Sequence, residues 1–225
     1  MGDHVLFFYG TLMAPQILHR VIHGSPTPQK WQADLLRFRP AILHGFQRHR
    51  VRGADYPGII STELSFSSSL SVQNGSRPGA ETAAGTGPSL NQEHATANAN
   101  AKVLGTVVSG LTDGDLHRLD IFEGSEYTRE RVQVRILTEA LSGDGEGDGD
   151  SDGQGGDGSG ENSDRHLKDV LEAAGAEFAD EGEEVEAETY VWVAGRKRLE
   201  NAEWDFEAFK RDKMAWWVTA DERDW

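Results

Sequence analysis

The sequence predicts an α+β fold, because strand-like segments alternate with segments of helical periodicity. Residues 5–8 form a continuous apolar run of the length that a buried strand needs. Residues 131–136 alternate between apolar and polar side chains, which is typical of a strand with one exposed face. Residues 103–108 and 189–193 are rich in β-branched side chains and are predicted to be two further strands. Gly105 interrupts the first of these and indicates a bulge or a close approach of another backbone segment.

Helices are predicted between and after these strands. Asp113 can cap a helix over residues 114–123, and Gly124 can end it. Asp205 can cap another helix near the end of the chain. Aromatic side chains recur there at roughly helical spacing with basic residues between them, so we expect core packing and a solvated basic face. These aromatic side chains are Phe206, Phe209, Trp216 and Trp217.

Charge and composition divide the chain. Its formal net charge is −16, and residues 139–188 hold 18 of the 38 acidic residues and two of the 22 basic ones, so this segment accounts for the whole net charge. Residues 65–101 and 139–186 contain few large apolar side chains and cannot offset the roughly 1–2 kcal/mol per residue that backbone ordering costs. We therefore expect one folded domain over residues 1–225, interrupted by a low-complexity insertion at 65–101 and an acidic Gly/Asp-rich insertion at 139–186, both disordered.

Several classes of protein are disfavoured. The chain has no cysteine, which excludes disulfides, thiolate metal sites and a cysteine nucleophile. Its N-terminus lacks the basic flank of a signal peptide, and no apolar run approaches the ~20 residues that span a bilayer. No basic patch is interleaved with aromatic residues, so nucleic acid is not an expected partner. We expect a soluble protein without membrane contact, in the cytoplasm or alternatively in the nucleus.

Metal-binding and hydrolase motifs are also missing. The sequence contains no HExxH, GxSxG or P-loop pattern. Residues 148–153 fit the beginning of a calcium loop, but Ser159 stands where such a loop requires a bidentate glutamate. We interpret this segment as a solvated acidic linker, and we expect neither a metal site nor an organic cofactor.

The helix predicted over residues 114–123 contains one anomaly. At about 100° per residue, Glu123 lies about 20° from Leu116 around the helix axis, so the carboxylate shares the apolar face. A charge in that position is costly unless it is paired or used. Burial raises the pKa of a carboxyl group, which suits a residue that takes and returns a proton near neutral pH. The alternatives are that fraying exposes Glu123 to water, or that Arg129 or Arg131 pairs with it.

A second candidate is the turn formed by Tyr9, Gly10, Thr11 and Leu12. An apolar strand runs into this turn and a helix is predicted from Ala14, so several backbone N–H groups meet there. Such groups can hold a carboxylate or a developing oxyanion. The alternative is a tight turn without a ligand.

Five short motifs follow one another along the chain. They are FFYGTL at 7–12, YPGI at 56–59, VLGTV at 103–107 with LT at 111–112, LDIFEGSEYTR at 119–129, and AETYVW at 187–192. In this order they resemble the gamma-glutamylcyclotransferase-like family, and within that family the avirulence-induced-gene branch. The resemblance covers residues 1–64, 102–138 and 187–225 and skips both insertions.

The resemblance implies a compact mixed β-barrel packed by helices, with a pocket between the turn and Glu123. It implies that Glu123 is the catalytic acid/base of a cyclisation that releases 5-oxoproline and an amine from a small gamma-glutamyl compound, without a cofactor. The backbone of the turn would hold the carboxylate of the substrate, and a tyrosine after the helix would line the pocket. The implied substrate-binding residues are Tyr9, Gly10, Thr11, Leu12 and Tyr127. The alternative is a relative that keeps the pocket as a non-catalytic ligand-binding or protein-interaction module.

Overall fold

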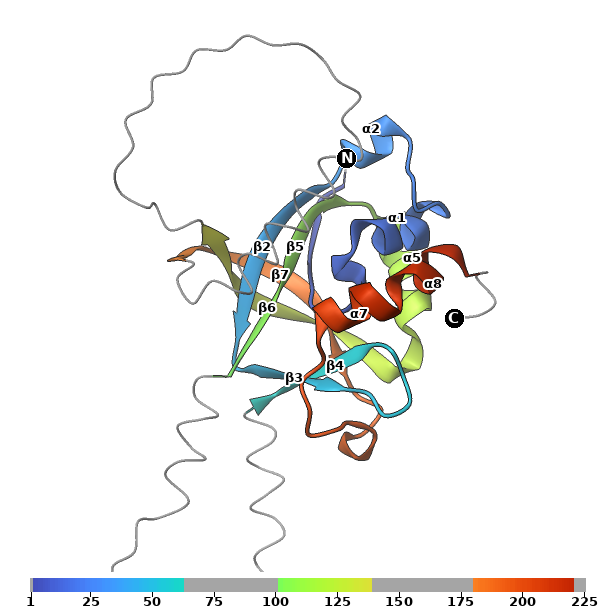
Figure 1. The fold of residues 1–225 in the computed structure, drawn as a ribbon. Coiled ribbons are helices and arrows are strands. Elements are labelled where there is room, and N and C mark those ends of the chain that lie inside the picture. Colours follow the sequence, from blue (N-terminus) through green and yellow to red (C-terminus); the bar gives the residue numbers. More distant parts are fainter. Residues whose placement is uncertain (1, 63–100, 139–179, 221–225) are drawn as a thin grey trace, which may run out of the picture.

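The computed structural model describes residues 2–62, 101–138 and 180–220 (Figure 1). Five strands form a closed barrel in the order β1-β5-β2-β6-β7. Neighbouring strands are antiparallel, except that β7 closes the barrel by pairing in parallel with β1. The strands are β1 (His4–Phe8), β2 (Arg37–His44), β5 (Lys102–Leu111), β6 (Tyr127–Thr138) and β7 (Asp180–Trp192).

The barrel is filled by the inward-facing side chains of its strands. Val134 of β6 and Phe7 of β1 are fully buried, and Val132 and Ile136 lie on the same face of β6 as Val134. A Cβ on Gly105 of β5 would lie 2.2 Å from the carbonyl oxygen of Phe8 and 2.5 Å from the Phe7 ring. The predicted close backbone approach at Gly105 is therefore confirmed, and only a glycine fits there.

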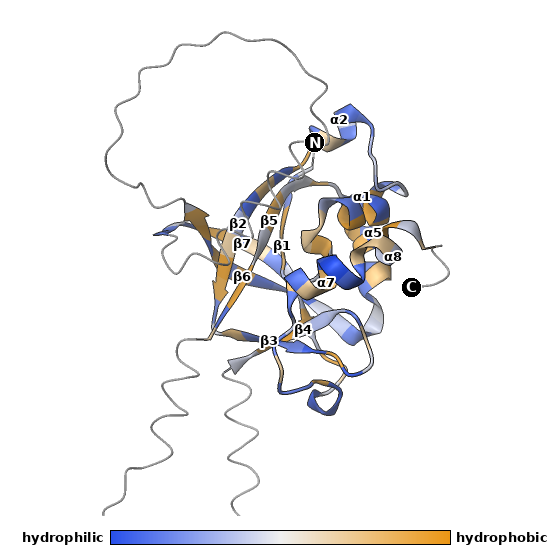
Figure 2. Cartoon of the chain, viewed as in Figure 1, coloured by the Kyte–Doolittle hydropathy of each residue, from blue (hydrophilic) through white to orange (hydrophobic). Residues whose placement is uncertain are grey.

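Helices cover one side of the barrel, and a two-stranded hairpin lies at one end of it (Figure 1). A second apolar cluster fills the space between the barrel and these helices. Figure 2 shows hydrophobic residues on the barrel strands and hydrophilic residues on α2 and much of α7. The hairpin strands are β3 (Phe46–Arg50) and β4 (Pro57–Ser61), and the α-helices are α1 (Pro15–His23), α2 (Lys30–Ala33), α5 (Asp113–Glu123), α7 (Phe206–Asp212) and α8 (Met214–Thr219).

Strand β7 begins well before the sequence predicted. The sequence placed the strand at residues 189–193 and assigned 139–186 to the acidic insertion, whereas β7 starts at Asp180. Ion pairs to β6 explain the difference, because Arg135 lies 3.2 Å from Glu184 and Arg131 lies 3.9 Å from Glu186. Residues 65–100 and 139–179, which include the candidate calcium loop, lie outside the described residues.

Helix α5 has the predicted extent but a different cap. Thr112, rather than Asp113, is the N-cap residue, and it forms a capping box with Asp115. The Asp115 N–H donates to the Thr112 hydroxyl over 3.2 Å, and the Thr112 N–H donates to the Asp115 carboxylate over 2.9 Å. Asp113 instead occupies the first helical position. Gly124 ends the helix with φ 64°, as its sequence position suggests.

The C-terminal aromatic segment forms two helices instead of one. Asp205 caps α7 as predicted, and Lys213 separates α7 from α8. Phe206, Phe209 and Trp217 are buried, so the expected core packing is confirmed for these three. The same expectation is wrong for Trp216, whose exposed fraction is 48%.

Acid is expected to destabilise the protein through His19 of α1. This histidine is 3% exposed, its ring stacks on His23 at 5.4 Å, and burial lowers its pKa to about 4, while nearby Asp115 partly opposes the shift. The unfolded state therefore binds more protons than the folded state between about pH 6.5 and 4, and stability falls as the pH drops through this range. We expect a loss of roughly 1–3 kcal/mol, measured by urea unfolding at several pH values.

The matched variant is His19→Leu. It removes the titrating ring, whose buried Nδ1 has no hydrogen-bond partner among the described residues. Its stability should depend less on pH over the same range. Equal pH dependence in the variant and the wild type would contradict the assignment to His19.

Candidate active site

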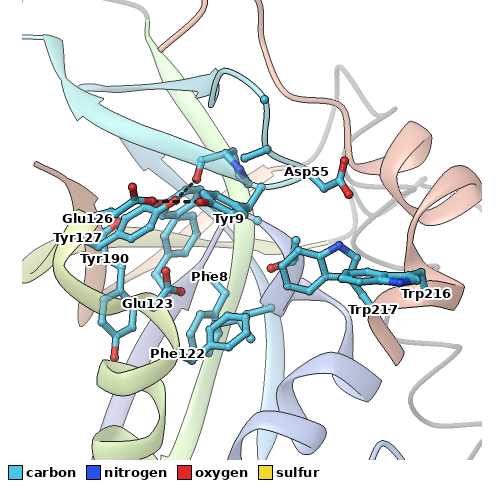
Figure 3. Close-up of a pocket in the computed structure, with 18 residues that line it drawn as sticks. Phe8, Tyr9, Asp55, Phe122, Glu123, Glu126, Tyr127, Tyr190, Trp216 and Trp217 are labelled. Carbon is cyan, nitrogen blue, oxygen red and sulfur yellow. Dashed lines mark hydrogen bonds between the residues drawn. The ribbon is translucent and has the colours of Figure 1, made fainter. Parts of the chain in front are cut away.

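A cavity of about 380 Å³ lies beside the N-terminal turn, at the end of α5 and against α8 (Figure 3). All four tyrosines of the chain line it, together with two of the six tryptophans. The lining residues are Phe7, Phe8, Tyr9, Gly10, Thr11, Leu12, Gly53, Ala54, Asp55, Tyr56, Pro57, Phe122, Glu123, Glu126, Tyr127, Tyr190, Trp216 and Trp217.

The structure brings together every site residue that the sequence singles out. The turn comes from the end of β1, Glu123 from the end of α5, and Tyr127 from the beginning of β6. The turn is more than a hundred residues before Glu123 and Tyr127 in the chain. The predicted residues that line this same cavity are Tyr9, Gly10, Thr11, Leu12, Glu123 and Tyr127.

The N-terminal turn leaves backbone donors available. The N–H groups of Met13 and Ala14 donate to the carbonyls of Gly10 (3.0 Å) and Thr11 (3.1 Å), and these bonds close the short 3₁₀ turn Thr11–Met13. The N–H groups of Gly10, Thr11 and Leu12 precede the first bonded donor, so the turn does not use them. A side chain at Gly10 is excluded, because its Cβ would lie 2.8 Å from the Pro57 ring.

Glu123 is the last residue of α5 and is partly buried at the cavity. Burial raises the pKa of its carboxyl group from 4.5 to about 8. The counter-ion alternative fails among the described residues, because Arg129 lies 3.6 Å from both Asp120 and Glu188, and Arg131 pairs with a glutamate of β7. No ion pair or hydrogen bond to Glu123 is found in the described part of the chain. The pKa of Glu123 therefore lies slightly above neutral pH, so its carboxyl group is mainly protonated there and ionises after a small rise in pH.

Hydrogen bonds fix the four tyrosine rings around Glu123. Burial raises the pKa of each phenol above 10.0, so all four stay neutral. Each hydroxyl donates to a group other than Glu123, which holds the rings as a rigid wall. The bonds run from Tyr9 to the Tyr190 carbonyl (2.6 Å), from Tyr127 to the Pro57 carbonyl (2.8 Å), from Tyr190 to Asp120 (2.8 Å) and from Tyr56 to Glu126 (3.0 Å).

Glu126 is a pocket residue that the sequence did not identify. Its position after the helix-ending Gly124 alone predicts that Glu126 tolerates substitution. In the structure it lines the cavity, accepts a hydrogen bond from Tyr56 and pairs with Arg198. The sequence carries no periodic signal for this role, because Glu126 lies in the short turn after α5 and so belongs to neither an α-helix nor a strand.

Arg48 of β3 is a second residue that the sequence did not identify. Its side chain is 11% exposed, and its Nη1 donates to the carbonyls of Tyr9 (3.0 Å) and Leu104 (3.3 Å), while its Nη2 contacts Glu203 at 2.9 Å. The peptide bond after Tyr9 is trans, so the Gly10 N–H points opposite to the Tyr9 carbonyl, away from Arg48. Arg48 thus fixes the direction of the first donor in the turn.

The described part of the chain has neither a metal-binding cluster nor a membrane-spanning helix. Residues 2–62, 101–138 and 180–220 contain no group of three or more His, Cys, Asp or Glu side chains arranged to hold a metal ion. No helix in these ranges is both long and apolar enough to cross a bilayer.

Comparisons with known proteins give relatives of one kind. No family model matches the chain. Protein AIG2 C of Arabidopsis thaliana is 23% identical over 208 residues, which cover 92% of this chain and 73% of the relative. AIG2-like protein B of the same plant is 24% identical over 217 residues, which cover 96% of this chain and 75% of the relative.

Two solved structures have limited similarity to this chain. A protein of Arabidopsis thaliana solved in solution has a TM-score of 0.43 and 22% identity, with 94% of this chain and 76% of that chain covered. The crystal structure of a gamma-glutamyl cyclotransferase specific to glutathione from yeast has a TM-score of 0.40 and 15% identity, with 90% and 74% covered. The homologues of this chain are AIG2 and AIG2-like proteins, which confirms the resemblance to the avirulence-induced-gene branch.

Proposed function

We propose that the protein is a gamma-glutamylcyclotransferase-like enzyme that releases 5-oxoproline and an amine from a small gamma-glutamyl compound. The observation that supports this best is the placement of Glu123. A carboxyl group with a pKa of about 8 lines the same cavity as a turn with available N–H donors. A group that titrates near the working pH can both accept and return a proton.

In the proposed reaction, the substrate enters with its α-amine uncharged. The α-nitrogen attacks the γ-carbonyl carbon, and a carbon–nitrogen bond forms as the five-membered ring closes. The bond from that carbon to the leaving nitrogen breaks. The ionised Glu123 accepts the proton that the α-nitrogen loses and returns it to the leaving nitrogen. Atoms and charge balance without water, metal or cofactor, and much of the rate gain comes from proximity in the folded substrate.

Each remaining residue has a binding role in this proposal. The N–H groups of Gly10, Thr11 and Leu12 hold the α-carboxylate of the substrate, since an anion is the natural ligand of unpaired N–H donors. The neutral rings of Tyr9 and Tyr127 exclude water around the reacting carbonyl. A drier site strengthens the electrostatic effect of the turn on the bound carboxylate.

A substrate screen tests the proposal. The full chain is incubated with a panel of γ-L-glutamyl dipeptides and amides, and 5-oxoproline is detected by mass spectrometry. We expect the wild type to release 5-oxoproline from at least one panel member and the Glu123→Gln variant to release almost none. Tight binding of panel members without any release would instead favour the non-catalytic binding module.

The pH profile gives a second, independent measurement. kcat/KM is expected to rise by between about tenfold and a hundredfold per pH unit below pH 8 and to level off only above the pKa values of both groups, because the reaction needs the ionised Glu123, whose pKa burial raises to about 8, and the uncharged α-amine of the substrate. The profile is measured from about pH 6 to pH 9 on the best substrate of the panel. A profile already level at pH 6 would show that another group acts as the base.

A further inference from the structure

Among the described residues, the cavity is lined by acidic side chains but by no basic ones. Asp55, Glu123 and Glu126 line it, whereas no lysine or arginine does. The turn at the end of β1 offers N–H donors for one carboxylate. A second carboxylate on the same ligand would find no cation in the lining.

Two cations are ion-paired with acids of the lining. Arg198 pairs with Glu126 and also lies over the Trp192 ring at 5.3 Å. Lys213 lies 3.2 Å from Asp55. Neither cation lines the cavity, so a ligand reaches the acidic partner of each pair rather than the basic one. An anionic group there would lose hydration and meet like charges, and both effects oppose binding.

Aromatic side chains form the other side of the cavity. Figure 3 shows Trp216 and Trp217 on the side of the cavity opposite Glu126 and Tyr127. Phe122 lies below, between these two groups. The Trp216 and Trp217 rings meet edge to face at 5.9 Å, and Phe122 meets Trp217 in the same way at 6.2 Å. Trp216 is 48% exposed, so a large aromatic surface faces solvent at this side of the cavity. Flat apolar groups are suited to such a surface.

We infer that the cavity takes γ-glutamyl derivatives of an arylalkyl amine that carries no carboxylate, with the aromatic ring of the amine against Trp216 and Phe122. The inference rests on the proposed function, because the γ-glutamyl half is assigned by that proposal. It adds the chemical class of the released amine. Gamma-glutamyl amino acids and peptides are then poor substrates, since their second carboxylate finds no cation in the lining.

Three probes separate the contributions of the carboxylate and the ring. γ-L-Glutamyl-phenethylamine and γ-L-glutamyl-L-phenylalanine differ only by one carboxylate, and γ-L-glutamyl-ethylamine lacks the ring. The expected kcat/KM for the phenethylamine derivative is at least about tenfold above each of the others, which corresponds to about 1.4 kcal/mol. Equal or faster turnover of the phenylalanine derivative would overturn the inference and leave the proposed function intact.

Calorimetry of the three probes with the full-length Glu123→Gln variant tests the ligand class separately from the proposed reaction. If no probe releases 5-oxoproline but the phenethylamine derivative binds at least about tenfold more tightly than the phenylalanine derivative, the proposed reaction fails and the ligand class stands. If the three probes bind equally, or none binds, the ligand class is wrong.

Trp216→Lys provides a gain-of-function variant. It replaces the aromatic surface with a cation at a half-exposed position, so it should fold and should narrow or reverse the preference between the two phenyl probes. Trp31→Lys is the matched control, because Trp31 is 65% exposed on α2 and does not line the cavity. An unchanged preference in Trp216→Lys, or the same change in Trp31→Lys, would contradict the role of Trp216.

Discussion

Replacement of Glu123 by glutamine is expected to lower turnover by about 10²–10⁴-fold, the range typical of a lost general acid/base. The amide keeps the size of the side chain but cannot accept the proton of the attacking nitrogen. Substrate affinity should change little, because the N–H groups of the turn and the aromatic wall are untouched. The measurement is single-turnover release of 5-oxoproline, together with calorimetry of substrate binding.

The same substitution should not destabilise the protein. Burial raises the pKa of Glu123 above its unfolded value, so the folded state holds the proton more tightly and stability falls as the pH rises from about 4.5 to 8. Glutamine removes this cost, and we expect a gain of roughly 1–3 kcal/mol at neutral pH. The gain should shrink below about pH 5, which urea unfolding at two pH values can measure.

The control for this substitution is Glu130→Gln. Glu130 is an exposed residue of β6 that does not line the cavity, so its loss should affect neither turnover nor stability. Glu126 is unsuitable as a control, since Tyr56 and Arg198 both contact it. Near wild-type turnover in Glu123→Gln would refute the proton-transfer role. A variant that unfolds would show that Glu123 is needed for structure instead.

The sequence predicted those strands and helices whose pattern is local. Residues 5–8, 103–108 and 131–136 all lie in strands, because apolar runs and clean alternation show in a single segment. Strand β2 was not predicted, since Pro40 lies within it and proline is normally excluded from inner strands. The first nine residues of β7 were also missed. Their acidic composition is compatible with a strand only because arginines of β6 lie opposite, and no reading of β7 alone shows this.

The candidate site was likewise predictable only where a local sequence pattern marks a residue. The helical face singled out Glu123, and the strand-to-helix pattern singled out the turn. Both line the same cavity. Tyr56, Glu126 and Arg48 were not recognised, because their partners are distant in the chain. Arg48 reaches Tyr9 across 39 positions and Glu203 across 155. A single sequence contains no signal for a hydrogen bond between a side chain and a distant carbonyl.

The loss of Arg48 should weaken both the fold and the carboxylate site. Arg48→Met keeps the length of the side chain but removes every donor, so the carbonyls of Tyr9 and Leu104 lose their bonds. We expect a loss of about 2–6 kcal/mol in stability, since each of the two acceptors left without a donor costs about 1–3 kcal/mol. Because the Tyr9–Gly10 peptide is then free to turn, KM should rise at least about tenfold while kcat changes less.

Two further variants separate positioning from general destabilisation. Glu203→Gln removes the ion pair but keeps both carbonyl contacts of Arg48, and because Glu203 is 69% exposed its loss should cost under about 1 kcal/mol and leave KM unchanged. Arg48→Lys keeps the charge and can donate to one carbonyl, so its KM should lie between those of the wild type and Arg48→Met. The amide resonance of Gly10 in ¹⁵N spectra of the folded variants reports the peptide directly. An Arg48→Met protein that loses stability but keeps both the wild-type KM and the wild-type Gly10 resonance would reduce Arg48 to a structural residue and show that the turn is held by other contacts.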